Sequence, residues 1–373
     1  MKIQKLLIGF VLLLIFTGGF FSGILFTNTK DDPALLSPKQ APMSTKMPNQ
    51  KQTPYWKQEQ SKVLIGYIQD FRNPEFVDYA KLTHLIFSFA HPTKDGGFLL
   101  NGDQTLNNLR THVLKAKQHN TKVILAVGGW FHINGGESYE YFKTAISNPD
   151  SRTKLVTELT NFTNKENLDG VDIDFEHPRS NEDAQNLATF TKELSNKLHS
   201  NNKELSIAVH AKIHGGTGTE AHFVKYDTAM FADVDHVNIM AYDGHWDGGY
   251  HAANLSPYSF TEKIVSYWGN LFEKNNLAKE KLVLGVPLYA QPEDQAIKQI
   301  SYATIIKNNP ANAEHDTVVL NGTTYHYNGQ VTMQKKTKLA LDNGFGGMML
   351  WELGHDPTGP YSLISSIFKN INS

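Results

Sequence analysis

The amino-acid sequence predicts an α/β fold in which parallel strands alternate with helices and close into a barrel. Eight strand-like apolar runs follow one another along the chain, and helical spacing of apolar residues fills several of the gaps. The runs are residues 63–67, 82–89, 122–127, 168–175, 205–209, 234–242, 282–288 and 346–351. Such an alternation predicts a (β/α)8 TIM barrel. A doubly wound open sheet is the weaker alternative, because no Gly-x-Gly-x-x-Gly turn follows the first run.

Apolar residues spaced three or four apart predict helices in four places. They are Leu106, Leu109 and Val113 after the second run; Leu155, Leu159 and Phe162 before the fourth; Ala184, Leu187, Phe190, Leu194 and Leu198 after the fourth; and Leu363, Ile367 and Phe368 at the end of the chain. This spacing places the apolar side chains on one face of a helix, which can pack against a sheet.

Residues 291–337, between the seventh and eighth runs, are too many for a plain loop. Within them, residues 318–320 and 323–327 flank Asn321-Gly322, a dipeptide typical of tight hairpin turns. We therefore predict a small α+β insertion with a hairpin after strand seven.

The N-terminal residues predict export. Lys2 and Lys5 precede an uncharged run over residues 6–26, which is long enough to span a bilayer. Residues 1–27 are therefore a signal peptide or an uncleaved signal anchor, and we favour the anchor. Residues 28–61 are rich in Pro, Lys, Gln, Ser and Thr and predict a flexible linker. The folded domain then covers residues 62–373, outside the cell or in the periplasm, with residues 6–26 as its only contact with a membrane.

The composition excludes several classes of protein. The chain has 373 residues, a net charge of −2 and 40% hydrophobic residues, which fits one large globular domain or two modest ones. Without a basic stripe, nucleic acid is not expected as a partner. Because the chain has no cysteine, disulfides, thiolate metal sites and a cysteine nucleophile are excluded. We expect a monomer that needs no cofactor.

The most informative segment is Asp-Gly-Val-Asp-Ile-Asp-Phe-Glu at residues 169–176. Side chains alternate between the two faces of a strand, so Asp172, Asp174 and Glu176 share one face and the apolar residues between them share the other. Three unpaired carboxylates in a confined space would repel one another and lose hydration, so at least one should hold a proton near neutral pH. This arrangement predicts a general acid. Asp169 has the opposite parity, and we assign it a structural role.

Aromatic residues gather at other predicted strand ends, where barrel enzymes place their chemistry. Trp130, Trp246 and Trp351 all fall at or just beyond such ends. Their flat apolar rings suit the C–H faces of sugars, although a single tryptophan there could equally cap the barrel.

These motifs together resemble glycoside hydrolase family 18, the chitinase family. The matches cover the chain from about residue 62 to its end: Asp169, Asp172, Asp174 and Glu176 in strand four; Met240, Tyr242 and Asp243 in strand six; Gly128, Gly129 and Trp130 in strand three; Gly285, Pro287 and Tyr289 in strand seven; and Gly346, Gly347, Met349 and Trp351 in strand eight. Five motifs in barrel order make a chance match improbable.

The chain departs from the family pattern at two places. Ala126 stands where the family often has a serine that is expected to bond the inner acid, so the charge of Asp172 is set differently here. Ala290-Gln291 stands where Gly-Arg often follows strand seven, which removes an expected sugar-binding arginine. Neither change alters Glu176.

The resemblance implies hydrolysis of N-acetylglucosamine polymers such as chitin, with retention and with the acetamido group of the sugar as nucleophile. Glu176 would protonate the leaving oxygen, Asp174 would bind the acetamido N–H, Asp172 would share a proton with Asp174, and Tyr242 would orient the acetamido oxygen. The sugar-binding residues implied are Asp243, Trp351 as the floor, Trp130, Tyr67, Met240 and Tyr289.

Two rivals share the same fold. An endo-β-N-acetylglucosaminidase acting on the chitobiose core of N-glycans would use the same acids, and a non-catalytic chitin-binding lectin would usually lack Glu176. Peptidoglycan, which also contains N-acetylglucosamine, is a remoter substrate. A catalytic metal is not expected, because the chain has no His-Glu-x-x-His motif and His210, four residues before His214, ends a predicted strand.

Overall fold

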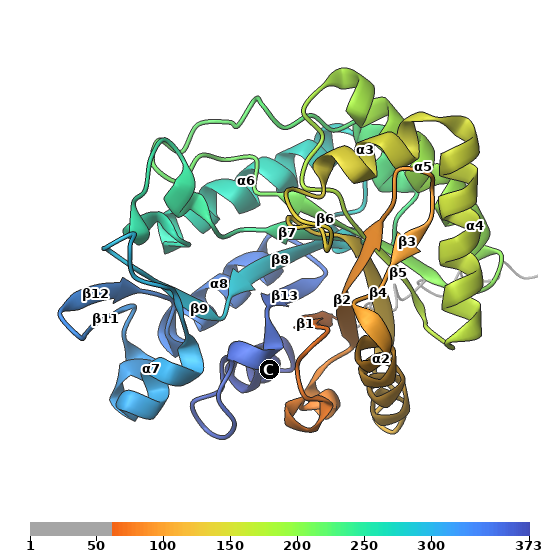
Figure 1. Ribbon diagram of the computed structural model, residues 1–373. Helices are drawn as coiled ribbons and strands as arrows, with labels where there is room; N and C mark the ends of the chain where they lie inside the picture. Colours follow the sequence, from red (N-terminus) through yellow and green to blue (C-terminus); the bar gives the residue numbers. More distant parts are fainter. Residues whose placement is uncertain (1–61) are drawn as a thin grey trace, which may run out of the picture. The chain divides into compact units, whose positions relative to one another are not determined.

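The structure is a computed structural model that describes residues 62–373. In it, eight parallel strands close into a barrel, because β1 pairs with both β2 and β13 (Figure 1). The barrel strands are β1 (Val63–Gln69), β2 (His84–Pro92), β4 (Lys122–Gly128), β5 (Gly170–Asp174), β6 (Glu204–His210), β7 (His236–Met240), β8 (Leu282–Pro287) and β13 (Gly347–Trp351). Every strand falls within or overlaps a predicted run, so the predicted TIM barrel is confirmed. The signal segment and linker predicted for residues 1–61 lie outside the described residues.

Helices surround the barrel, and the four predicted from apolar spacing are present as α2, α4, α5 and α9. The helices are α2 (Gly102–Lys117), α3 (Tyr139–Ser147), α4 (Pro149–Lys165), α5 (Asn181–His199), α6 (Tyr258–Lys274), α7 (Tyr302–Asn308), α8 (Gln330–Asp342) and α9 (Leu363–Ile371). Helix α5 begins with a capping box in which Ser180 and Asp183 each bond the backbone N–H of the other. None of the helices in residues 62–373 combines the length and the apolar character that crossing a membrane requires.

The two faces of each strand contact different surroundings. Outward side chains such as Val171 and Ile173 are fully buried against the helices and belong to the main hydrophobic core. Inward side chains form a smaller cluster inside the barrel, which includes Ile65, Ile124 and Met349. Burying a side chain of this size stabilises the fold by about 1.5–3 kcal/mol. The inner face of β5 therefore places Asp172 and Asp174 beside this apolar cluster inside the barrel.

The insertion after β8 is a second sheet with strand order β10-β9-β12-β11. Its strands are β9 (Tyr289–Pro292), β10 (Ile300–Ser301), β11 (Thr317–Leu320) and β12 (Thr323–His326), and α7 lies between β10 and β11. The predicted hairpin is present: β11 and β12 pair in antiparallel fashion, and Asn321 and Gly322 both have positive φ, 50° and 81°. These angles are those of a tight hairpin turn.

The bounds of the insertion differ from the prediction. Pairing in the second sheet begins at Tyr289, and residues 330–337 belong to α8, which contacts α6 and α9. The buried face of α8 hides its helical pattern because several of its residues are polar. Lys336 is fully buried and donates hydrogen bonds to Ser256 O at 2.6 Å and Asn328 Oδ1 at 2.7 Å.

A short strand, β3 (Phe98–Leu99), pairs in antiparallel fashion with the end of β2. It extends β2 beyond the barrel, on the side where the loops after β2 and β4 meet. The C-terminal ends of the barrel strands and the loops that follow them thus form one crowded face.

Candidate active site

The acidic row of β5 lies inside the barrel, as its alternation predicts. Asp172 is 0% exposed and Asp174 is 3% exposed, while Glu176 follows the end of the strand and is partly buried. Asp169 lies before the strand, where its carboxylate accepts a hydrogen bond from the Val123 N–H at 2.8 Å. This contact between neighbouring strands fits the structural role assigned to Asp169.

Asp172 is held by hydrogen bonds from three other strands. The Tyr67 hydroxyl donates to one of its oxygens at 2.8 Å, and Ser206 Oγ and Asn238 Nδ2 donate to the other at 2.5 Å and 3.1 Å. Burial raises the pKa of Asp172 to about 6, and these three bonds keep it from rising further. Ser206 and Asn238 thus satisfy the inner acid where Ala126 cannot.

Asp174 and Glu176 have no comparable support. Asp174 Oδ1 is buried without a hydrogen-bond partner among residues 62–373. Burial, together with the nearby charges of Glu176 and Asp172, raises the pKa of Asp174 well above its usual value. Burial, and after it the charge of Asp243, raises the pKa of Glu176 to about 7. A carboxylic acid that keeps its proton near neutral pH can act as a general acid.

Tyr242 and Asp243 follow the end of β7 and face the same space. The Tyr242 hydroxyl lies 3.9 Å from Met349 Sδ, so it makes only a weak contact and can bond a ligand. Asp243 adopts φ = 62° and accepts a hydrogen bond from the Tyr289 hydroxyl. Desolvation in this site raises the pKa of Asp243 to about 6, although 51% of its side chain is exposed and the bond from Tyr289 opposes the rise.

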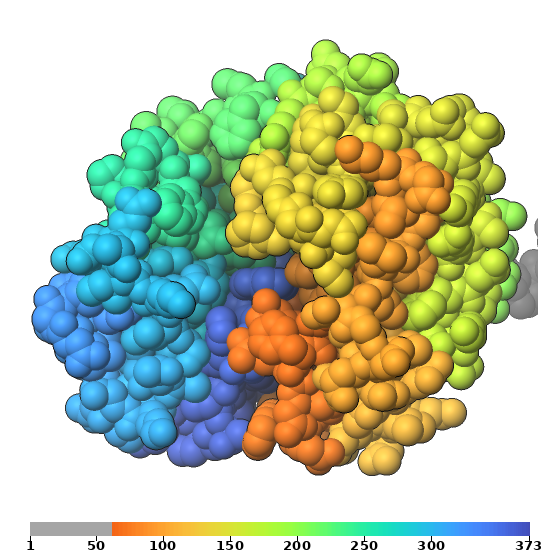
Figure 2. All heavy atoms as spheres, viewed as in Figure 1, coloured from red at the N-terminus to blue at the C-terminus, as the bar shows by residue number. Residues whose placement is uncertain are grey.

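A cavity of about 400 Å³ opens beside these groups. Its walls come from the strand ends, the loop after β7 and the insertion, and its lining residues are Asp243, Trp246, Tyr250, Tyr289, Gln291, Gln295, Ala296, Ile297, Lys298, Gln299 and Trp351. The space-filling view is hollowed near its centre, where segments from the start, middle and end of the domain meet (Figure 2). The ring of Trp351 packs against Tyr67 and Phe89, with ring centres 5.7 and 5.8 Å away, which fixes its orientation.

The predicted sugar-binding residues do not all lie at the cleft surface. Tyr67 is only 2% exposed and lies below the cleft as a support for Asp172, so the expectation that it lines the cleft is corrected. The reason is its inward position on β1, deep in the barrel. Trp130 is 38% exposed and lies beside His177, with ring centres 6.4 Å apart, outside the cavity lining. Met240 is partly buried against the inner cluster.

Four residues that contribute to the site were not predicted. Ser206 and Asn238 are polar residues at inward positions of predicted strands, and that parity could have identified them. Tyr250 lines the cavity from a loop and Gln291 from the short strand β9, and neither position was indicated by residue spacing. Among residues 62–373, the one cluster of histidine and acidic side chains spaced for a metal ion lies elsewhere.

The chain belongs to glycosyl hydrolase family 18, whose family model matches residues 53–356. The strand-end motifs and the closed barrel agree with this membership. Chitinase 1 of Aphanocladium album is 24% identical over 361 residues, which cover 80% of this chain and 82% of that protein. A chitinase-like effector of Moniliophthora roreri is 31% identical over 227 residues, which cover 57% of this chain and 53% of the effector. The match thus spans about half of the effector's length.

Solved structures show the same architecture. The crystal structure of a family 18 chitinase from the chitin utilization locus of Flavobacterium johnsoniae has a TM-score of 0.69 at 27% identity, covering 83% of this chain and 94% of that chain. A Group IV chitinase of Ostrinia furnacalis has a TM-score of 0.67 at 20% identity, covering 84% and 100%, which supports the fold alone.

Proposed function

We propose that the protein is a chitinase that hydrolyses β-1,4 linkages between N-acetylglucosamine units, with retention and with assistance from the substrate. The observation that carries this proposal is the pair formed by Asp174 and Glu176, whose pKa values are both raised. Asp243, whose charge acts on Glu176, lines a cavity together with Trp351. Family membership and the chitinases among the relatives support it.

The acids crowd one strand, which argues against a nucleophilic carboxylate. Retaining glycosidases that form a covalent intermediate place two carboxyl groups about 5–5.5 Å apart on either side of the scissile bond. Here the row Asp172, Asp174 and Glu176 approaches from one side only. A nucleophile supplied by the substrate removes the need for the second carboxylate and requires a 2-acetamido sugar.

In the first step, Glu176 gives its proton to the glycosidic oxygen as the bond from that oxygen to the anomeric carbon breaks. The acetamido oxygen bonds the same carbon and forms an oxazolinium ion. Asp174 accepts a hydrogen bond from the acetamido N–H and stabilises the positive charge, and the Tyr242 hydroxyl donates to the acetamido oxygen and orients it. In the second step, water attacks the anomeric carbon while the bond from that carbon to the acetamido oxygen breaks, and Glu176 takes the proton from the water. Two inversions in sequence retain the configuration.

Asp172, Asp243 and Trp351 support this chemistry. Asp172 lies below Asp174 and shares a proton with it, which tunes the charge of Asp174. Asp243 is held by Tyr289 and faces the cavity, where it can bind a sugar hydroxyl. Trp351 offers a flat apolar surface beneath the sugar ring. Tyr289 and Met240 help to shape this end of the cleft.

We also propose that the domain acts outside the cell as a monomer. The uncharged run at residues 6–26 supports export, and residues 28–61 would connect it to the domain. A relative described as a secreted chitinase, from Penicillium expansum, is 29% identical over 237 residues. Fractionation of producing cells, with and without residues 1–27, tests export and anchoring.

The substrate is tested by incubating the full chain with chitin oligosaccharides and, in parallel, with an N-glycoprotein, and identifying the products by mass. The proposal expects chitin fragments whose new reducing ends are initially β-anomers by NMR. Cleavage of the N-glycan core alone would show an endo-β-N-acetylglucosaminidase, and binding without cleavage of either substrate would show a lectin. Equal cleavage of polymers that lack the acetamido group would contradict substrate assistance.

The acid is tested by Glu176→Gln. Loss of the proton donor should lower kcat by about 10⁴-fold, the upper range for general acid catalysis, with little change in oligosaccharide binding. Glu193→Gln is the matched control and should keep full turnover, because Glu193 lies on the outer helix α5, where its carboxylate pairs with Arg152 of α4. Turnover of the Glu176 variant at the control's rate would refute the assignment.

A further inference from the structure

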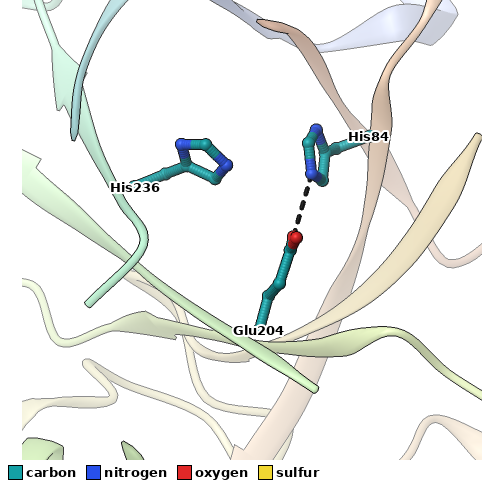
Figure 3. A group of neighbouring side chains, drawn as sticks. All are labelled: His84, Glu204 and His236. Carbon is teal, nitrogen blue, oxygen red and sulfur yellow. Dashed lines mark hydrogen bonds and ion pairs between the residues drawn. The ribbon is translucent and has the colours of Figure 1, made fainter. Parts of the chain in front are cut away.

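A second group of titratable side chains lies at the opposite end of the barrel from the cavity. His84 begins β2, Glu204 begins β6 and His236 begins β7, so all three lie at the N-terminal ends of strands. One possible ligand atom from each lies within 4.8 Å of those of the other two. Figure 3 shows the three side chains converging from different strands.

His84 is oriented as a metal ligand usually is. Its Nε2 lies 2.9 Å from Glu204 Oε2, and its Nδ1 lies 2.8 Å from Thr83 Oγ. The Thr83 hydroxyl is also within 3.1 Å of Leu64 O, so it can donate either to His84 Nδ1 or to that carbonyl. Either tautomer of His84 is therefore satisfied without movement of the backbone, and Nε2 can present its lone pair to a cation. A partner on the second ring nitrogen is the usual support of a ligating histidine.

His236 provides the third group. Its ring lies edge-on to the ring of His84, with centres 5.0 Å apart. Its Nδ1 is buried and has no hydrogen-bond partner among residues 62–373. Buried polar atoms without partners are uncommon and call for an explanation such as an ion or a water molecule.

We propose that His84, Glu204 and His236 bind a divalent transition-metal ion of the zinc type, with water as a fourth ligand. Two imidazoles and one carboxylate are a ligand set that zinc accepts at about 2.0–2.2 Å. Ligand atoms around a tetrahedral ion lie about 3.4 Å apart. The possible ligand atoms here lie within 4.8 Å of one another, so rotation of the His236 ring towards the other two would close the site. Mg²⁺ and Ca²⁺ prefer an all-oxygen shell and should bind weakly.

The position of the site indicates a structural effect. At the N-terminal end of a barrel, interactions contribute to stability, whereas the chemistry lies at the other end. The ion would join β2 to β6 and β7, which are not neighbours of β2 in the sheet. The site is therefore independent of the proposed hydrolysis.

Lys122 limits the affinity of the proposed site for a metal ion. Its ammonium group pairs with the second oxygen of Glu204, and the Lys122 side chain is 46% exposed. Its positive charge would repel a metal ion on the same carboxylate. Lys122→Met should therefore tighten binding, whereas loss of a ligand should weaken it, and these opposite signs separate a metal site from a plain salt bridge.

The test uses the untagged full chain, freed of metal and titrated with ZnCl₂, with CoCl₂ as a spectroscopic probe and MgCl₂ as the comparison. We expect one tight Zn²⁺ ion per chain, a tetrahedral Co²⁺ spectrum, and a rise of about 5 °C in the midpoint of thermal unfolding at 100 times Kd. Glu204→Gln and His236→Gln should each weaken Zn²⁺ at least about 100-fold, and Lys122→Met should tighten it about tenfold.

His326→Gln is the matched control, because His326 pairs with Glu293 at 3.1 Å without a third ligand. It and Glu176→Gln should leave the tight site unchanged. If the His236 variant fails to fold, as judged by circular dichroism, His84→Gln takes its place. The proposal is overturned if the wild type binds no Zn²⁺, if the ligand variants bind as tightly as the wild type, or if Lys122→Met weakens binding.

Discussion

Partly buried glutamates occur at both ends of the barrel, but their surroundings differ. At the C-terminal ends of the strands, burial and the charge of Asp243 raise the pKa of Glu176 to about 7. At the N-terminal ends, burial also acts on Glu204, yet the bonds and charges of His84 and Lys122 outweigh it and lower the pKa to about 2. Both residues are glutamates that begin from the same ordinary value.

The difference shows how one fold separates chemistry from stability. A buried acid with a cationic partner is a stable anion and has no proton to give. A buried acid beside other acids retains its proton, at a cost to stability, and is ready to give it to a substrate. Asp174, with a buried oxygen left without a partner, is the extreme case at the C-terminal end.

The largest expected difference between the two ends of the barrel is in activity, and it is tested by comparing Asp174→Asn with Glu204→Gln. The asparagine lacks the charge that stabilises the oxazolinium ion, so we expect kcat to fall by about 10³-fold, as on loss of an oxyanion-hole donor. Glu204→Gln should keep activity within about threefold per folded molecule, because it lies at the other end of the barrel. Activity assays on folded protein check both, and equal losses would break the comparison.

The second test is stability, where the two ends should give opposite signs. The raised pKa of Glu176 means that folding favours the protonated carboxyl. Ionisation of Glu176 therefore lowers the free energy of unfolding; this loss is absent below the unfolded pKa near 4.5 and complete above pH 7. Glu176→Gln should therefore raise the free energy of unfolding by up to about 3 kcal/mol at pH 8 and leave it unchanged at pH 4.

Glu204 has a lowered pKa, so its contribution is present above the unfolded pKa and is lost as the pH falls towards 2. Glu204→Gln should lower the free energy of unfolding by about 1–2 kcal/mol at pH 8. This value is reduced because the Glu204 side chain is 26% exposed and solvent screens its interactions. Urea unfolding at pH 4 and pH 8 measures both variants. If Glu176→Gln were less stable than the wild type at pH 8, ionised Glu176 would not destabilise the folded protein and the expectation would be wrong.

A third test concerns Tyr242, whose hydroxyl makes only a weak contact with Met349. Tyr242→Phe removes the donor to the acetamido oxygen but leaves the packing, so we expect kcat to fall about 100-fold with KM little changed. Tyr226→Phe, whose hydroxyl accepts from the His210 N–H, is a matched control with a smaller expected loss. Steady-state kinetics give kcat and KM for both variants. If kcat fell by similar factors in Tyr242→Phe and Tyr226→Phe, the role of Tyr242 would be packing.

The fold followed from the sequence because strand and helix periods are local properties. The acids of β5 were identifiable because alternation alone places Asp172 and Asp174 inside. Helix α8 was missed in part because its buried face contains Lys336, whose charge is satisfied by Asn328 and Ser256 from other segments. Local spacing does not contain such tertiary contacts.

The same limit applies to the site. Tyr67 was expected at the cleft surface, yet its depth in the barrel depends on the register of β1 against its neighbours. His84, Glu204 and His236 are 32 or more residues apart in sequence, so no local motif unites them. Barrel closure brings these residues together, and they become visible only once the strand register is known.

The smallest effect we predict is the pH dependence that follows from Glu176. Because its pKa is raised to about 7, the proton it must donate is lost above that pH, and kcat/KM should fall about tenfold per pH unit on the alkaline side. Asp243→Asn removes a negative charge that helps to raise this pKa, so the alkaline limb should move to lower pH even though binding also weakens. Glu204→Gln should leave the limb in place. Profiles of kcat/KM from pH 5 to 9 are measured for the wild type and for both variants. If the alkaline decrease shifted in Glu204→Gln and not in Asp243→Asn, the group that titrates would lie at the N-terminal end of the barrel, and the assignment to Glu176 would be wrong.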